Sequence, residues 1–488
     1  MKLCKLPKIL PGVHPPVPED WAEVEVLNIA HDSRRVKPGS VFVAISGRER
    51  DGNAYIEDAL ARGAVAIVSE KPVRPSRPVV TLTVGDARRA LAALASAFYG
   101  KPSRRLHVIG VTGTNGKTTT TYMIRSILEA AGYRCGVLGT IGYETGRRSL
   151  PASITTPESL SIQEYLAEMV AEGLDYAAME VSSHSLCMRR VDFVQFAAAV
   201  FTNLSPEHMD YHRTLAAYRE AKARLFSALG PASVAVLNAD DPSAAAMARG
   251  TFARVLYYGI KNRADVSARI EDSTLDGIRM TLATPSGEAK LSLPLIGAHN
   301  VYNALGAAAV TLALGRDLSA IRDGLEHVPL VPGRLEPVPC PKGCKVLVDF
   351  AHTDQALKSV LQSLRPLTSK RIIVVFGAGG DRDREKRPRM GRVVELGADM
   401  AWVTSDNPRS EAPLDIIEEI LSGVRSRRRL RVQPDRQAAI AEALGAARPG
   451  DLVLIAGKGH ERTQRFKDKV IPFDDREAVE HAFAAAEG

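Results

Sequence analysis

A glycine-rich stretch, residues 110–119, holds residue types that bind phosphate groups. It reads Gly-Val-Thr-Gly-Thr-Asn-Gly-Lys-Thr-Thr and lies between the apolar run 106–111 and a helical run that ends at Gly132. Glycines let backbone N–H groups close around phosphate oxygens, while the lysine supplies charge and a threonine hydroxyl can reach magnesium. Because position 111 is valine, only the shorter Gly-x-x-Gly-Lys-Thr core of the general pattern is present. We expect a nucleoside triphosphate site, rather than a glycine-rich turn alone, formed by Gly113, Thr114, Asn115, Gly116, Lys117, Thr118 and Thr119.

A magnesium ion at such a site needs oxygen ligands. Glu180 ends a predicted strand in Ala-Met-Glu-Val-Ser-Ser-His, which places its carboxylate well, although strand-end carboxylates are usually only solvated. His208, in Asn-Leu-Ser-Pro-Glu-His, reads as an ordinary loop histidine, because histidine is not a favoured magnesium ligand. Lys222, judged from its neighbours alone, is expected to be an exposed lysine on a helix.

Polar loops follow each of four predicted strands in the last third of the chain. The strands are 346–349, 372–376, 401–405 and 452–456, and the loop after the third reads Asp-Asn-Pro-Arg. Taken alone, Asp-Asn-Pro-Arg is typical of a polar turn. However, ligands of open parallel sheets bind outside the carboxyl ends of the strands. These loops together therefore predict a second binding site.

The elements that must position these residues alternate between strands and helices. Predicted strands at 41–45, 64–68, 106–111, 176–181, 197–202 and 234–237 and predicted helices at 55–62, 87–99 and 300–314 indicate an α/β protein. Boundaries fall near Gly100-Lys-Pro and Val331-Pro-Gly. We expect a smaller N-terminal α/β domain (1–103), a central phosphate-loop domain with a doubly wound, mostly parallel sheet (104–332), and a C-terminal Rossmann-like α/β domain (333–488).

Composition narrows the class of protein. The 488 residues are 45% hydrophobic and 25% charged, which is typical of a globular protein with several cores. No apolar run is long enough to span a bilayer, and Lys5, Pro7 and Lys8 interrupt any apolar core of a signal peptide. We therefore expect a cytoplasmic protein that is not inserted in a membrane. We also expect it to be a monomer.

The net charge of +8 suits an anionic partner, either nucleic acid or a phosphate-rich small molecule. The basic run 425–431, Arg-Ser-Arg-Arg-Arg-Leu-Arg, has no aromatic residues on which bases could stack. We interpret it as a solvated face and expect no nucleic-acid binding.

Five cysteines, an odd number, predict no disulfide framework. The close pair Cys340 and Cys344 could be half of a zinc knuckle, but no second pair at matching spacing completes the four ligands. We interpret Cys-Pro-Lys-Gly-Cys as a tight hairpin turn.

Six motifs in order closely resemble the Mur ligase family, the ATP-dependent enzymes that add amino acids to the peptidoglycan precursor. They are Thr-Gly-Thr-Asn-Gly-Lys-Thr, Met-Glu-Val-Ser-Ser-His, Asn-Leu-Ser-x-x-His-x-Asp-Tyr-His, Gly-Ala-His-Asn-x-x-Asn, Gly-Arg, and Val-Asp-x-Ala-His-Thr. The resemblance covers almost the whole chain. Valine at position 111 is the family's own form of the loop.

The resemblance implies roles for single residues. Lys117 contacts the ATP phosphates, and Thr118, Glu180 and His208 hold magnesium. Lys222 matches a carbamylated lysine that helps to hold a second magnesium ion. The positions that surround adenine and ribose are Asn300, Asn303, Arg334 and Asp349.

Within the family, the chain resembles the branch that adds the third residue of the stem peptide to UDP-N-acetylmuramoyl-L-alanyl-D-glutamate. The implied reaction forms an acyl phosphate on the D-glutamate γ-carboxyl, which an amine then attacks. The residues that resemble contacts to this substrate are Ser33, Arg48, Glu49, Arg50, Thr155, Thr156, Ser182 and Arg190. Three departures are Ile154 where asparagine is frequent, Phe350 where tyrosine is usual, and the absence of proline from Thr353-Asp-Gln.

The Asp-Asn-Pro-Arg loop is what the meso-diaminopimelate-adding branch carries. Meso-diaminopimelate differs from lysine by a second carboxylate, which an arginine can grip through two parallel hydrogen bonds. Asp406 and Asn407 can accept from the neighbouring ammonium, and Pro408 restricts the loop. The residues implied in this site are Arg382, Asp406, Asn407, Pro408, Arg409, Gly457 and Glu461.

Alternatives stay open at the level of sequence. The nearest are a lysine-adding tripeptide synthetase and a folylpolyglutamate synthetase. A nucleic-acid-dependent ATPase would need a stacking platform, and a dehydrogenase would need a third glycine where Arg382 follows Gly-Ala-Gly-Gly-Asp.

Overall fold

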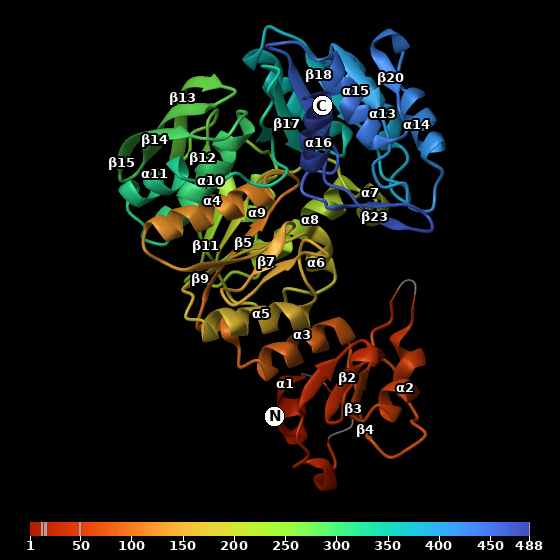
Figure 1. Cartoon of the computed structure of the whole chain (residues 1–488). Helices are drawn as coiled ribbons and strands as arrows, with labels where there is room; N and C mark the ends of the chain where they lie inside the picture. The colour runs from red at the N-terminus through yellow and green to blue at the C-terminus, as the bar shows by residue number, and fades with distance from the viewer. Residues whose placement is uncertain (11–12, 14–16, 48–49, 488) are drawn as a thin grey trace.

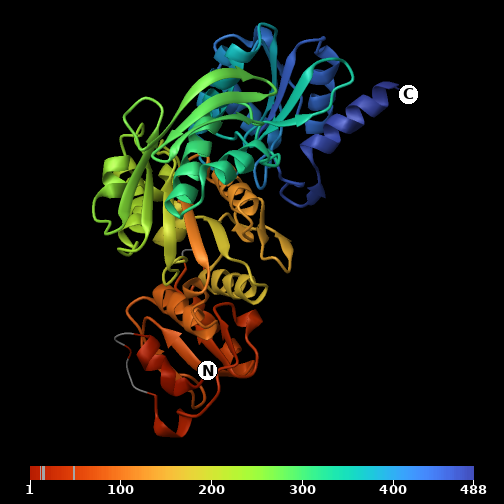
Figure 2. The ribbon, with the colours of Figure 1, turned by 90° about the vertical axis from the view of Figure 1, so that its left-hand side faces the viewer.

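The computed structural model describes residues 1–10, 13, 17–47 and 50–487, except the side chains of 485–487. These residues form three large sheets and a small two-stranded one. Figures 1 and 2 show an elongated molecule with the N-terminal sheet at one end, the largest sheet in the middle and the C-terminal sheet at the other end. Each large sheet lies inside one of the segments 1–103, 104–332 and 333–488, whose limits remain a prediction.

The N-terminal sheet has four parallel strands in the order β1-β2-β3-β4. Asp86 caps α3 by accepting a hydrogen bond from the N–H of Arg89, and the apolar face of α3 packs on this sheet. The elements are β1 (Asn28–Ala30), β2 (Ser40–Val43), α2 (Ile56–Ala61), β3 (Ala64–Ser69), β4 (Val80–Thr83) and α3 (Ala87–Phe98), preceded by the short α1 (Leu6–Ile9). The predicted strands and helices here are confirmed within one to three residues.

The central sheet has the order β15-β14-β13-β12-β11-β10-β5-β9-β6-β7-β8 and is parallel from β13 to β6. Its strands are β5 (His107–Thr112), β6 (Cys135–Leu138), β7 (Gly142–Glu144), β8 (Ser149–Pro151), β9 (Tyr176–Glu180), β10 (Phe196–Phe201), β11 (Val234–Asn238), β12 (Arg254–Gly259), β13 (Val266–Thr274), β14 (Gly277–Thr284) and β15 (Gly287–Leu293). Along β5, Ile109 and Val111 join the core on one face and Val108 joins the core on the other. The predicted doubly wound, mostly parallel sheet is confirmed.

Helices cover both faces of the central sheet. They are α4 (Lys117–Ala130), α5 (Ser159–Ala171), α6 (Ser183–Cys187), α7 (Met209–His212), α8 (Leu215–Ser227), α9 (Ala244–Ala248), α10 (His299–Ala313) and α11 (Leu318–Glu326). α4, α10 and α11 belong to one core, and α5, α6 and α8 belong to the opposite core. The central strand β5 is thereby buried, and its carboxyl end opens into the phosphate loop.

The C-terminal sheet has the order β16-β17-β21-β18-β19-β20, in which β16 alone is antiparallel among the described strands. Its elements are β16 (Glu336–Val338), β17 (Lys345–Asp349), α12 (Asp354–Leu364), β18 (Ile372–Phe376), α13 (Lys386–Gly397), β19 (Met400–Val403), α14 (Pro413–Leu421), β20 (Leu430–Val432), α15 (Arg436–Ala446), β21 (Leu452–Ala456) and α16 (Asp475–Glu487), with the hairpin β22 (Thr463–Arg465) and β23 (Val470–Pro472). The four predicted strands are neighbours, so their polar loops do share one edge.

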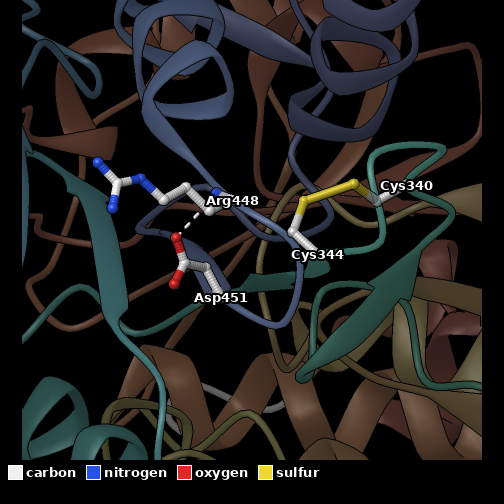
Figure 3. Close-up of a disulfide and its surroundings, with 4 residues drawn as sticks. All are labelled: Cys340, Cys344, Arg448 and Asp451. Atoms are coloured by element: carbon white, nitrogen blue, oxygen red, sulfur yellow. Dashed lines mark hydrogen bonds between the residues drawn. A yellow bond between two sulfur atoms is a disulfide. The ribbon is translucent and has the colours of Figure 1, made fainter.

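The hairpin between β16 and β17 corrects one expectation. Its turn is present as predicted, but Cys340 and Cys344 are joined by a disulfide, with their Cα atoms 5.9 Å apart (Figure 3). Composition cannot reveal a single local crosslink, because the pairing depends on how the turn directs the two Cβ atoms. Nearby, the Arg448 N–H donates to the Asp451 carboxylate at 2.8 Å.

None of the described helices is both long enough and apolar enough to cross a bilayer.

Candidate active site

The phosphate loop lies between β5 and α4, at the carboxyl edge of the central sheet (Figure 1). Gly113 and Gly116 have φ angles of +155° and +85°. A Cβ atom at Gly113 would overlap the Thr202 hydroxyl, and one at Gly116 would overlap the Asn303 amide oxygen. Both positions therefore require glycine, for backbone and for packing reasons.

The Lys117 ammonium lies against its own loop. It donates to the carbonyl oxygens of Gly113 at 3.0 Å and Thr114 at 2.7 Å. Burial lowers the pKa of Lys117, while the carboxylates of Glu207 and Glu180 oppose this effect. These carbonyl contacts are weak compared with a phosphate, so the ammonium is free to turn to an anionic ligand.

Glu180 is buried and connects the phosphate loop to neighbouring segments. Its carboxylate accepts from the Thr118 hydroxyl at 3.1 Å, and from the N–H and hydroxyl of Thr140 at 2.7 and 3.1 Å. Arg334 donates to the Thr118 hydroxyl at 3.1 Å. The tertiary structure thus brings Thr118, Glu180 and Arg334 together from segments far apart in sequence.

The oxygens of Thr118 and Glu180 have the chemistry that magnesium prefers. In the described part of the chain, no group of three or more histidine, cysteine, aspartate or glutamate side chains could hold a metal ion alone. This donor set fits magnesium, which keeps several water or phosphate ligands and takes few from protein.

His208 has a left-handed backbone, with φ +57°, and its ring lies 4.7 Å from the ring of His184. Burial lowers the pKa of His208, so its ring is neutral and can act as a nitrogen ligand. Its neighbour Glu207 was not among the predicted site residues. Burial would raise the pKa of Glu207, but the nearby His208, Lys117, His352 and Lys222 lower it. Its place beside His208 in the same motif was the signal for including it.

Lys222 is buried, so the expectation of an exposed helix lysine is wrong. The residue is 1% exposed, its Nζ donates to the Gly113 carbonyl at 2.7 Å, and it lies 4.5 Å from the ring centroid of Tyr218. Burial, aided by the charge of Lys117, lowers its pKa well below 10.5. Tyr218, Ala221 and Leu225 are buried at helical spacing, and this apolar face of α8 was the signal that Lys222 points inward.

A cavity of about 440 Å³ opens beside the phosphate loop. It lies between the central segment and the loop after β17, and the predicted residues that line it are Asn115, Gly116, Thr118, Thr119, Asn300, Asn303, Arg334 and Asp349. Asp240, Lys261 and Tyr302 also line it and were not predicted. Asp240 and Lys261 come from the loops after β11 and β12, and Tyr302 comes from the first turn of α10.

Arg334 and Asp349, both from the C-terminal segment, line one side of this cavity. The guanidinium of Arg334 lies 5.0 Å from the ring centroid of Phe350. The Asp349 carboxylate accepts from the N–H groups of Leu335 and Ala351, both at 2.8 Å, and burial raises its pKa. On the opposite side, the Asn303 amide donates to the Asn300 oxygen at 2.9 Å.

The residues predicted to contact the muramoyl dipeptide form one network beside Glu180. The Thr156 hydroxyl donates to the Glu180 carbonyl at 2.8 Å and accepts from the Ser182 N–H at 3.0 Å. Arg190 donates to the Thr156 carbonyl at 3.1 Å. The Thr155 hydroxyl accepts from Thr140 at 3.1 Å.

The UDP-sugar residues lie in the N-terminal segment. Ser33 is buried and Arg50 is exposed, while Arg48 and Glu49 lie outside the described residues. Burial lowers the pKa of His31, and the Glu158 carboxylate opposes this shift. Glu158 also forms an ion pair with Arg190 at 2.6 Å. The segment that holds His31 and Ser33 therefore faces the network formed by Thr155, Thr156, Ser182 and Arg190.

The Asp-Asn-Pro-Arg loop after β19 is held by the loop after β21. The Asn407 amide donates to Glu461 at 2.7 Å, and its oxygen accepts from Lys458 Nζ at 3.2 Å and the Arg465 N–H at 3.0 Å. Asn407 was expected to accept from an incoming ammonium, but both lone pairs of its oxygen are occupied. Its contacts instead fix the loop.

With the Asn407 oxygen engaged, Asp406 is the remaining acceptor in this loop for a ligand ammonium. It is 7% exposed, and its Oδ2 atom has no hydrogen-bond partner among the described residues. Gly457 allows this close packing, because its φ is +122° and a Cβ there would lie 2.6 Å from Asp406 Oδ2. A buried carboxylate oxygen without a partner is costly, so it suits a cationic ligand group.

Arg409 and Arg382 lie close to each other. Burial and the charge of Arg382 lower the pKa of Arg409, whose φ is +55°. Within the described residues, neither guanidinium has a carboxylate within 4.0 Å; Arg409 donates to the Gly380 carbonyl and Arg382 to the Asp381 carbonyl. Arg409, with Arg382 and the Asp406 carboxylate both acting on its charge, has the chemistry to bind a ligand that carries a carboxylate and an ammonium.

The chain is similar to known proteins in both sequence and structure. Models of the Mur ligase middle domain, the Mur ligase glutamate ligase domain and the Mur ligase family catalytic domain match residues 111–311, 333–459 and 25–99. A Geobacillus thermodenitrificans protein named UDP-N-acetylmuramoyl-L-alanyl-D-glutamate--2,6-diaminopimelate ligase is 46% identical over 485 residues, with 98% of both chains covered. A Geobacter metallireducens protein of the same name is 44% identical, with 94% of both covered.

Two solved structures also resemble the structure of this chain. One of a protein with that same name is 33% identical and has a TM-score of 0.70, with all of both chains covered. Mycobacterium tuberculosis folylpolyglutamate synthase, complexed with ADP and AMPPCP, has a TM-score of 0.62 at 22% identity and covers 75% of this chain and 91% of its own. The second likeness supports the fold alone.

Proposed function

The chain belongs to the Mur ligase family, and we propose that it is an ATP-dependent ligase that joins meso-2,6-diaminopimelate to the D-glutamate γ-carboxyl of UDP-N-acetylmuramoyl-L-alanyl-D-glutamate. Several full-length relatives at 43–46% identity carry the name of this activity. The observation that carries the proposal is Arg409, which has Arg382 and Asp406 as neighbours and no carboxylate within 4.0 Å among the described residues, together with the Asp406 oxygen that has no hydrogen-bond partner there.

The first step activates the γ-carboxylate. A carboxylate does not react with an amine in water, because oxide would have to leave, so the ATP γ-phosphoryl group is transferred to it first. Lys117 turns from its loop carbonyls to the phosphates, and the N-terminus of α4 and Arg334 add positive potential. Bound magnesium, held through Thr118, Glu180 and His208, would neutralise charge on the transferred group.

The second step forms the amide. The amine of diaminopimelate attacks the acyl phosphate, and phosphate leaves. Arg382 and Arg409 hold the distal carboxylate and Asp406 holds the distal ammonium, so the other amine is directed toward the nucleotide cavity. The Asn407–Glu461–Lys458 contacts keep this loop in place.

Lys222 is proposed to be carbamylated. Its buried amine has a lowered pKa, so it holds a neutral fraction that can attack carbon dioxide. The product is an anionic carbamate next to Lys117 and Gly113, where it can serve as a further metal ligand. The predicted cytoplasmic location and monomeric state remain predictions.

One experiment tests the proposed acceptor and amine. The purified chain is given UDP-N-acetylmuramoyl-L-alanyl-D-glutamate, ATP and magnesium with one amino acid at a time, and the products are weighed by mass spectrometry. We expect the mass of the diaminopimelate adduct together with one ADP per product. Preferential incorporation of L-lysine would make the lysine-adding synthetase the better assignment.

A further inference from the structure

Lys386 is a half-buried cation next to a residue of the nucleotide cavity, and the proposed mechanism does not use it. It is the first residue of α13, four residues after Arg382, and its Nζ donates to the His352 carbonyl at 3.0 Å. Within the described residues no carboxylate lies within 4.0 Å of it, whereas the buried Lys458 is paired with Glu461 at 3.1 Å. An ammonium with spare donors and no anion is available to a ligand.

Lys386 lies between the nucleotide cavity and the loops proposed to bind diaminopimelate. His352, which it bonds, lines the nucleotide cavity together with Glu207 and Arg334. The hydrogen bond to His352 therefore places the Lys386 ammonium at this cavity, while α13 begins just after the loop that carries Arg382. Burial lowers the pKa of Lys386, and the carboxylates of Asp406, Asp383 and Glu207 oppose this shift.

The other cations of the site already have contacts or proposed roles. Lys117 lies on the Gly113 carbonyl, Arg334 donates to the Thr118 hydroxyl, and Arg409 has Arg382 and Asp406 as neighbours. The reacting carbonyl still needs a positive group, because acyl transfer develops negative charge on its oxygen.

We infer that the Lys386 ammonium contacts the reacting acyl group and stabilises the oxyanion formed when the amine adds. This role rests on the proposed ligase function. The nitrogen lone pair forms the new C–N bond, and the carbonyl π electrons move to the oxygen beside Lys386. The oxyanion then reforms the carbonyl as the bond between the acyl carbon and the bridging phosphate oxygen breaks, and its electron pair leaves with that oxygen. The proton lost by nitrogen is carried away on the departing phosphate as hydrogen phosphate.

The test uses Lys386→Gln, which keeps a donor for the His352 carbonyl and loses the charge, and Lys386→Arg, which keeps the charge. Lys358→Met, on the exposed face of α12, is the matched control. Measurements are kcat for tripeptide formation, KM for ATP and for diaminopimelate, and melting temperature. Borohydride trapping separates acyl phosphate formation from its use.

We expect kcat of Lys386→Gln to fall by about 100-fold, with both KM values within about threefold of wild type. Trapped acyl phosphate should accumulate, Lys386→Arg should recover much of kcat, and Lys358→Met should behave as wild type. A Gln variant with nearly normal kcat, or Gln and Arg variants equally impaired with lowered melting temperatures, would overturn the inference. If the Gln variant does not fold, Lys386→Met decides in the same assays. A wild-type chain that adds no amino acid would instead refute the proposed function.

Discussion

Two buried lysines, one in the central segment and one in the C-terminal segment, have opposite surroundings. Lys222 is 1% exposed and donates only to the Gly113 carbonyl among the described residues, at 2.7 Å, beside the Tyr218 ring. Lys458 is 0% exposed and donates to Asn407, Glu461 and the Thr463 carbonyl at 3.2, 3.1 and 2.6 Å. Both lysines are fully buried, but among the described residues only Lys458 has a carboxylate within 4.0 Å.

The difference separates a structural lysine from a reactive one. A buried ammonium that pairs with a carboxylate can tie loops together, whereas one without such a partner is driven toward the neutral amine. Lys458 therefore joins the loops after β19 and β21. The lowered pKa of Lys222 instead favours the neutral amine, whose lone pair carbamate formation needs.

The largest expected effect comes from removing the reactive lysine. Lys222→Ala should lower kcat by about 100-fold or more, because an anionic metal ligand is lost. High bicarbonate with a short-chain carboxylic acid should restore part of the rate by supplying that ligand. Rates are measured as ADP release and product mass, with exposed Lys358→Met as the control. Wild-type turnover without added acid would remove Lys222 from the mechanism.

Removing the structural lysine should act on stability instead. Lys458→Met leaves the Asn407 and Thr463 oxygens without this donor and Glu461 without its cation. Because the Glu461 side chain is 35% exposed, the expected loss is about 2 kcal/mol of unfolding free energy, less than for a fully buried pair. Urea unfolding measures it against exposed Lys467→Met, and equal midpoints for the two variants would contradict the structural role.

A change of geometry at constant charge should be milder. Arg409→Lys loses one of two parallel hydrogen bonds to a carboxylate, so KM for diaminopimelate should rise about tenfold, equivalent to about 1.4 kcal/mol. KM for ATP should stay unchanged. Steady-state kinetics with exposed Arg428→Lys as control provide the measurement, and an unchanged diaminopimelate requirement would speak against this role.

The smallest effect concerns pH. Since the folded-state pKa of Lys222 lies below its ordinary value of 10.5, the folded chain binds fewer protons than the unfolded chain between those two pH values. The free energy of unfolding of the wild type should therefore rise, through Lys222, as the pH increases from the folded-state pKa of Lys222 toward 10.5. In buffer free of carbon dioxide, Lys222→Met should melt above wild type at pH 7, and the gap should narrow toward pH 10. A constant gap would argue that Lys222 stays charged when buried.

The residue pattern predicted most of the fold and the outline of the site. The strands and the order of motifs follow from local apolar runs and loop chemistry, which need no partner to be recognised. The placement of Lys222, the engagement of the Asn407 oxygen and the Cys340–Cys344 disulfide were missed. Each depends on which side chain from elsewhere lies opposite, and sequence spacing does not give that.

By itself, the sequence determined that a phosphate loop exists, that polar loops end neighbouring parallel strands, and that the chain resembles the Mur ligases. Tertiary structure alone decided which charges are compensated. Lys458 meets Glu461, while Lys222, Arg382 and Arg409 meet no carboxylate within 4.0 Å in the described chain. The physical reason is that the protonation and reactivity of a buried charge depend on distances to its neighbours in space, and the fold brings those neighbours from separate segments.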